Sequence, residues 1–155
     1  MAIVLCSASP RRRELLAQAG VPFVVRAVDL DESVHAGEAP IPYVRRLAEA
    51  KARAAREQVK QLDDTYLGAD TTVVCDDRIL GKPADARDAL AMLASLSGRW
   101  HEVTTAFCVL SAERCEVQHV TTRVELRPIH ADEQAAYVAS GEWEGKAGGY
   151  AIQGI

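Results

Sequence analysis

The chain has 155 residues, of which 48% are hydrophobic and 26% are charged, and its formal net charge is −4. This length suits one domain, the composition excludes disorder for the bulk of the chain, and the acidic balance argues against a general nucleic-acid-binding protein. No apolar stretch reaches the roughly 20 residues of a membrane-spanning helix, and the N-terminus lacks the order of a secretory signal. We therefore expect a cytoplasmic protein that binds neither membranes nor nucleic acid.

Charge is unevenly distributed along the chain. Residues 1–60 carry 10 Lys and Arg against 7 Asp and Glu, whereas residues 61–155 carry 8 against 15. A basic cluster inside an acidic protein fits a small anionic ligand better than a polyanion. The cysteines lack zinc spacing and are expected to stay reduced, although Cys108 and Cys115 can face each other across a hairpin.

The first part of the chain predicts strands alternating with helices. The apolar run 2–6 is typical of a short buried strand. Ser9 then stands at the N-cap of a helix with Pro10 at its first position and Gly20 at its end. The apolar stripe of this helix consists of Leu15, Leu16 and Ala19. The next expected elements are a strand over 23–26 and a long helix over 41–60.

The rest of the chain is richer in strands. Residues 100–110 and 115–127 alternate polar and apolar side chains, which predicts an antiparallel hairpin. Helices interspersed with such strands imply an α/β fold, with a mixed twisted sheet and flanking helices. Neither of the glycine-rich nucleotide-binding motifs GxGxxG and GxxxxGK[ST] is present, so a nucleotide would have to be bound by other residues. The other expected elements are strands 66–75 and 79–80, helices 85–96 and 131–139, and a glycine-rich loop over 141–155.

The segment SASPRRR at 7–13 joins the first strand to the first helix. Free N–H groups at a helix N-terminus, the hydroxyls of Ser7 and Ser9, and the guanidinium of Arg12 can together bind a phosphate. Cations in a first helical turn oppose the helix dipole, so an anion should compensate them. A capped helix with solvated arginines explains the same pattern, and both interpretations stay open.

Lys51 falls on the apolar stripe of the long predicted helix, together with Val44, Leu47, Ala48 and Ala55. Its ammonium group must therefore either snorkel to the helix edge or reach into a cleft.

Asp70 lies inside a predicted strand, between Gly68-Ala69 and Thr71-Thr72. A carboxylate there is costly to bury unless it is hydrogen-bonded, paired or metal-bound, and the small residues before it leave room for a ligand. We favour a functional role over a strand-end turn or a structural ion pair. Lys82 ends the hairpin that begins with this strand, so the two side chains can face one cleft.

Two loops add weaker candidates. Asp31-Glu32 offers a carboxylate for a metal or a base, although an exposed acidic loop has the same pattern. The glycine-rich segment 146–154 can approach a ligand closely, and the amide of Gln153 can read a base edge, but a plain surface turn explains the glycines equally well. The four histidines lack metal spacing and are expected at surface or strand positions.

Seven weak motifs occur in a fixed order along almost the whole chain: SASPRR, the acidic pair 31–32, Lys51, GADTTVV, GKP, LSGRWHEVTTA and KAGGYAIQG. Together they resemble the Maf family of nucleotide pyrophosphatases. The last motif resembles the dTTP/UTP branch, because the 7-methyl-GTP branch usually has Glu where Gln153 stands.

This resemblance implies a fold of two lobes around a nucleotide cleft, related to the inosine-triphosphate pyrophosphatases, with homodimers common. It also implies hydrolysis of a nucleoside triphosphate between the α and β phosphates, with a divalent cation, Mg²⁺ or Mn²⁺. Family members typically continue beyond the last motif. We therefore expect residues 1–155 to form a single Maf-like domain that lacks its C-terminal strand and helix.

The resemblance further implies roles for individual residues. Asp70 matches the proposed general base, and Glu32 matches an acidic cleft residue, so both are candidate metal ligands. Arg12, Thr71 and Gln153 match positions linked to substrate choice. The positions that match phosphate contacts are Ser7, Ser9, Arg12, Lys51 and Lys82.

These roles agree with the needs of phosphoryl transfer, which are cations on the phosphates, a metal, and a group that orients or deprotonates water. Whether Asp70 acts as the base or as a metal ligand is open at this level. Two other functions also stay open: hydrolysis of a modified nucleotide such as 7-methyl-GTP, and nucleotide binding without turnover in a regulator of cell division and septum formation.

Overall fold

The computed structural model describes residues 1–154. Their six strands form one sheet in the order β2-β1-β3-β5-β6, with β4 paired to β3. Strand β1 is parallel to β2 and β3, whereas β4 is antiparallel to β3, which confirms the predicted mixed α/β fold. The elements are β1 (Ile3–Leu5), α1 (Pro10–Gln18), β2 (Phe23–Val25), α2 (Pro40–Val59), β3 (Thr65–Cys75), β4 (Arg78–Leu80), α3 (Ala86–Leu96), β5 (Trp100–Leu110), β6 (Cys115–Glu125), α4 (Ala131–Ser140) and the 3-10 helix η1 (Ala147–Gly149).

The chain divides into two compact units, which agrees with the two lobes that the resemblance implies. Unit 1 comprises Met1–Asp70 and Thr105–Val120, and unit 2 comprises Thr71–Thr104 and Thr121–Ile155. Strands β3, β5 and β6 each contribute residues to both units. Ile155, at which the expected single domain ends, lies outside the described residues.

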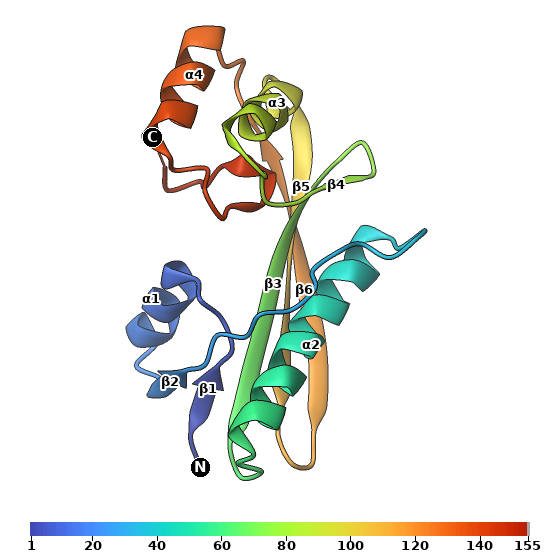
Figure 1. The fold of residues 1–155 in the computed structure, drawn as a ribbon, viewed down its shortest axis with the longest axis vertical. Coiled ribbons are helices and arrows are strands. Elements are labelled where there is room, and N and C mark those ends of the chain that lie inside the picture. The colour runs from blue at the N-terminus through green and yellow to red at the C-terminus, as the bar shows by residue number, and fades with distance from the viewer. Residues whose placement is uncertain (155) are drawn as a thin grey trace. The chain divides into compact units, whose positions relative to one another are not determined.

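Unit 1 is built on the packing of α2 against the sheet (Figure 1). A Cβ added to Gly68 of β3 would stand 2.1 Å from the carbonyl oxygen of Ala48 and 2.8 Å from the backbone nitrogen of Ala52. Glycine therefore lets β3 approach α2 at this point more closely than any side chain would allow. Nearer the N-terminus of α2, Arg45 Nη1 lies 3.1 Å from His119 Nδ1 of β6.

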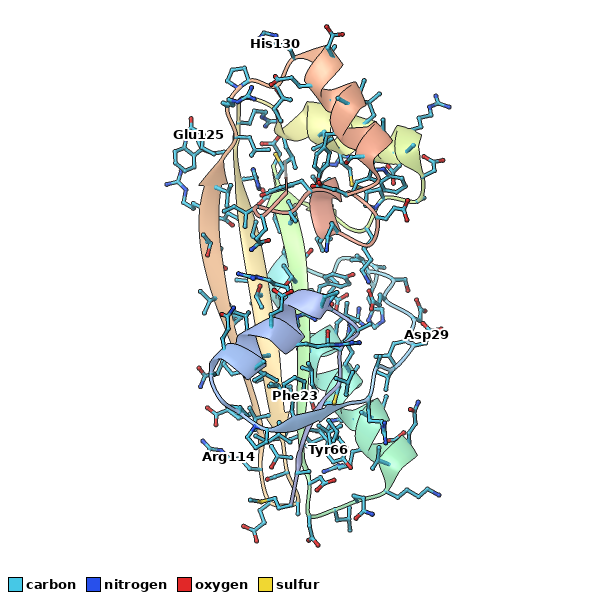
Figure 2. All side chains as sticks on the ribbon, turned by 90° about the vertical axis from the view of Figure 1, so that its left-hand side faces the viewer. Phe23, Asp29, Tyr66, Arg114, Glu125 and His130 are labelled. Carbon is cyan, nitrogen blue, oxygen red and sulfur yellow. The ribbon has the colours of Figure 1, made fainter. Side chains whose placement is uncertain are left out.

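Unit 2 has its own buried cluster, to which β3 and α3 contribute. We call Val73, Cys75 and Leu96 the unit 2 cluster; Tyr150 and Leu126 are among the residues packed against it. Figure 2 shows Glu125 at the end of β6 and His130 just before α4, which are both parts of this unit.

Two expectations about the elements were wrong in detail. Within Pro10–Gln18, all of which the structure describes, no residue of α1 is buried, and Leu15 of the predicted apolar stripe is 52% exposed. Strand β6 ends at Glu125 and not at Arg127, although the N–H of Leu126 still donates to the carbonyl of Arg99, just before β5, at 3.2 Å.

The four cysteines, which all lie in the described part of the chain, are free thiols, as expected. Cys108 and Cys115 do face each other across the β5–β6 hairpin, with their sulfurs 3.9 Å apart. None of the helices found within residues 1–154 is long and apolar enough to cross a membrane.

Glu133 links the N-terminus of α4 to the segment that precedes this helix. Its carboxylate accepts hydrogen bonds from the guanidinium of Arg127 at 2.6 Å and from the His130 N–H at 3.0 Å, and these lower its pKa from the ordinary 4.5 to about 2. Because the folded pKa lies below the unfolded one, the stabilisation is present above pH 4.5 and is lost as the pH falls toward 2.

We therefore expect Glu133→Gln to lower the melting temperature at pH 7, and to lower it by a smaller amount at pH 3. Thermal melts of both proteins across this range check the expectation. An equal difference at the two pH values would show that the carboxylate charge contributes nothing.

Candidate active site in unit 1

Arg12 turns back from α1 toward the end of β1 and the middle of β3. Its Nη1 donates to Ser7 Oγ at 2.9 Å and to the carbonyl of Ala69 at 2.8 Å. The backbone N–H of Ser9 donates to the same Ser7 hydroxyl at 3.2 Å. The interpretation of this segment as a capped helix with solvated arginines therefore fails for Arg12, whereas it suits Arg11, which is exposed and pairs with Glu14.

Ser9 occupies the N-cap position of α1 as predicted, with an extended backbone and Pro10 following it. The pattern Ser-x-Ser-Pro thus starts the helix and also places the Ser7 hydroxyl next to Arg12. Because Ser7 is only 6% exposed, its hydroxyl is held in a fixed position at this helix start.

Lys51 reaches into the site and does not snorkel to the helix edge. Its Nζ donates to Asp70 Oδ1 at 2.6 Å and to Glu32 Oε1 at 2.9 Å. Lys51 is 8% exposed and Asp70 is 7% exposed, so this pair is shielded from water. Three separate segments, α2, β3 and the loop before α2, are thereby joined by one ammonium group.

Tyr43 holds the loop before α2 in place, because its hydroxyl donates to the backbone carbonyl of Glu32 at 2.8 Å. Tyr43 is not among the site residues predicted from the sequence. The signal was nevertheless present, since Tyr43, Leu47 and Lys51 lie at i, i+4 and i+8 on the same buried stripe of α2.

The electrostatics of the site follow from burial and from its pairing of charges. Burial raises the pKa of Asp70, and the charge of Glu32 adds to this effect, whereas Lys51 and Arg12 oppose it. Burial also lowers the pKa of Arg12 while Asp70 and Glu32 raise it, and a guanidinium remains charged in either case. Asp70 is therefore a stronger proton acceptor than an exposed aspartate would be.

The donor set suits a hard divalent cation that is shared with a substrate. Asp70 and Glu32 contact one Lys51 nitrogen, so their oxygens are close enough to contact one cation. Among residues 1–154, no group of three or more His, Cys, Asp and Glu side chains is placed to hold a metal. Two carboxylates, completed by water and phosphate oxygens, are the usual arrangement for Mg²⁺.

The structure thus places six of the nine predicted site residues in unit 1 and the other three in unit 2. Thr71 is half-buried in β3, Lys82 is exposed after β4, and Gln153 is exposed after η1. The residues gathered in unit 1 are Ser7, Arg12, Glu32, Lys51 and Asp70, with Ser9 at their edge.

The loops that carry Lys82 and Gln153 are joined to each other within unit 2. The backbone N–H of Gly148 donates to the carbonyl of Gly81 at 3.0 Å. Gly148 has φ +72°, and a Cβ there would stand 2.9 Å from Val73. This glycine is therefore required for close packing of the loop, and the plain surface turn is the wrong interpretation.

The family model described as Maf-like protein matches residues 2–155. The chain belongs to the Maf family. Among its relatives is the dTTP/UTP pyrophosphatase of Methylobacillus flagellatus, which is 52% identical over 99% of this chain and 77% of that protein. The dTTP/UTP pyrophosphatase of Cereibacter sphaeroides is 51% identical over the whole of this chain and 80% of that protein.

A solved structure supports the fold of this Maf family chain. The Ham1 protein of Staphylococcus aureus superposes with a TM-score of 0.51, covering 81% of this chain and 71% of that one, at 15% sequence identity. At this identity the likeness concerns the fold and not the activity.

Proposed function

We propose that this Maf family chain hydrolyses dTTP and UTP to the nucleoside monophosphate and pyrophosphate. The observation that carries the proposal is the buried pair of Asp70 and Lys51, with Glu32 and Arg12 beside it, in a chain about half identical to two dTTP/UTP pyrophosphatases. A buried carboxylate with raised pKa, surrounded by cations, is what hydrolysis of a phosphoanhydride requires. Such an activity on free nucleotides suits the cytoplasm.

In this proposal Asp70 takes the proton from the attacking water. Lys51 fixes one oxygen of the Asp70 carboxylate at 2.6 Å, and we assign the proton to the other oxygen, Oδ2. Burial raises the pKa of this carboxyl group, which improves its basicity toward water. The water attacks the α-phosphorus, the bond to the bridging oxygen breaks, and pyrophosphate leaves.

Arg12 and Lys51 act on the charge of the phosphates. Both are held in fixed positions before substrate binds, Arg12 by Ser7 and Ala69, and Lys51 by its two carboxylates. Preorganised cations stabilise developing negative charge without a cost of reorganisation during the reaction. We propose Lys82 of unit 2 as a further phosphate contact, and Thr71 and Gln153 as residues of substrate choice.

Glu32 and Asp70 would hold a divalent cation, Mg²⁺ or Mn²⁺. When bound, such a cation neutralises phosphate oxygens and withdraws electron density from the phosphorus. Glu32 has a side chain that is 33% exposed, so it can exchange its bond to Lys51 for a ligand from solution.

Incubating the protein with dTTP, UTP and 7-methyl-GTP in Mg²⁺ or Mn²⁺ tests the proposal. We expect pyrophosphate and the monophosphate from dTTP and UTP, with much slower release from 7-methyl-GTP. Preferred cleavage of 7-methyl-GTP would identify the other branch of the family. Binding without any product would identify a nucleotide-sensing regulator, and orthophosphate as first product would refute cleavage between the α and β phosphates.

A further inference from the structure

His101 and Tyr150 form a partly buried polar pair in unit 2 that the proposed function does not use. His101 Nε2 and the Tyr150 hydroxyl lie 2.5 Å apart, and the two rings meet edge to face with centroids 5.5 Å apart. His101 is 3% exposed, and burial lowers the pKa of its imidazole, which is therefore mostly neutral at pH 7. His101 lies on β5, one of the strand positions expected for the histidines, and is buried there.

Tyr150 is the residue from which the segment carrying Gln153 departs. Its ring packs against the unit 2 cluster. The chain then makes a turn over 151–154, in which the N–H of Gly154 donates to the carbonyl of Ala151 at 2.9 Å. Gln153 lies within this turn, so its position depends on where Tyr150 anchors the chain.

The segment that follows Tyr150 borders a groove. Tyr150, Ala151, Ile152 and Gly154 line a groove of about 540 Å³ within unit 2, and Ile152 is 79% exposed. With a groove beside the segment, a directional contact such as the His101 hydrogen bond is needed to fix it.

The chemistry of a glutamine amide explains why a fixed position matters. The amide has one acceptor oxygen and a donor NH₂ group, and a rotation of 180° exchanges them. In one orientation it pairs with the N–H and carbonyl of a uracil-type edge, and in the other with the ring nitrogen and amino group of cytosine. Gln153 can therefore distinguish the two edges only when it is held in one orientation.

We infer that His101 and Tyr150 are positioning residues, which hold Gln153 for recognition of the uracil-type base edge. The inference rests on the proposed function, because it needs a pyrimidine nucleotide as substrate and Gln153 as the residue that contacts its base. It predicts that a loss of the hydrogen bond changes base preference more than it changes the chemical step.

Tyr150→Phe is the decisive variant, since it removes the hydroxyl and keeps the ring packed. We expect the KM for dTTP to rise about three- to tenfold with kcat changed less than about twofold, and the preference for dTTP over dCTP in kcat/KM to fall by a similar factor. His101→Leu should act in the same way. His101→Gln, whose amide can still reach the phenol, should largely restore the preference.

A second measurement separates positioning from a general loss of stability. Tyr66→Phe removes another buried hydroxyl, which donates to the carbonyl of Gln61 at 2.9 Å in unit 1, and it should leave base preference unchanged. The double variant of His101→Leu with Tyr150→Phe should be no less selective than the worse single variant, because both remove the same bond.

The possible failures can be told apart. A wild-type protein that cleaves neither dTTP nor UTP overturns the proposed function. A wild-type protein that cleaves dTTP and dCTP equally well, or a Tyr150→Phe protein with unchanged preference, overturns the positioning role and leaves the proposed hydrolysis standing.

Discussion

Replacing Asp70 by Asn should reduce kcat for dTTP by about 10²–10⁴-fold while leaving the protein folded. The amide has nearly the same shape as the carboxyl group and its oxygen can still accept from Lys51, but it cannot take a proton from water. Burial raises the pKa of Asp70, so the ionised carboxylate is itself costly to keep in this place. The melting temperature should therefore change little. Steady-state kinetics and a thermal melt measure both quantities.

Asp76→Asn is the matched control for this variant. Asp76 follows the same strand, but its side chain is 68% exposed and pairs with Arg99 at the surface. Activity in this control should equal that of the wild-type protein. Asp70→Asn with comparable turnover to wild type would remove Asp70 from the reaction.

Replacing Lys51 by Met should have the largest effect on stability. Met fills the space of the alkyl chain but leaves Asp70 buried without its closest cation, and places Glu32 beside it as a second negative charge. Removing one partner of a buried ion pair costs about 3–5 kcal/mol. We expect a loss in this range by denaturant unfolding, together with a loss of activity.

Two further variants show whether the cause is charge. Arg53 lies on the exposed side of the same helix and pairs with Glu49 there, so Arg53→Met should cost at most about 0.5 kcal/mol. Combining Lys51→Met with Asp70→Asn should recover much of the lost stability, because the amide carries no charge to bury. If the double variant is as unstable as the sum of the single variants predicts, the loss arises from packing.

The elements could be predicted from sequence because local signals agreed with one another. Ser9 and Pro10 marked the start of α1, and the alternation of side chains marked the β5–β6 hairpin. Lys51 was correctly placed on a buried stripe, and the cost of burying Asp70 correctly indicated a partner. These inferences needed only periodicity and the chemistry of single residues.

What the sequence did not determine was which residues meet. Snorkelling and burial of Lys51 fit the same helical pattern, and the choice depended on a carboxylate 19 residues later in the chain. The contact between His101 and Tyr150 joins residues 49 positions apart, and neither has a local signal of its pairing. The exposure of Leu15 also depends on tertiary packing, because an apolar stripe is buried only where another element covers it.

The position at which water attacks tests the account most directly. Turnover of dTTP in ¹⁸O-labelled water, followed by mass spectrometry of the products, locates the new phosphorus–oxygen bond. Attack at the α-phosphorus predicts the label in thymidine monophosphate and none in pyrophosphate. Label in the pyrophosphate would contradict the mechanism built on Asp70 and its neighbours.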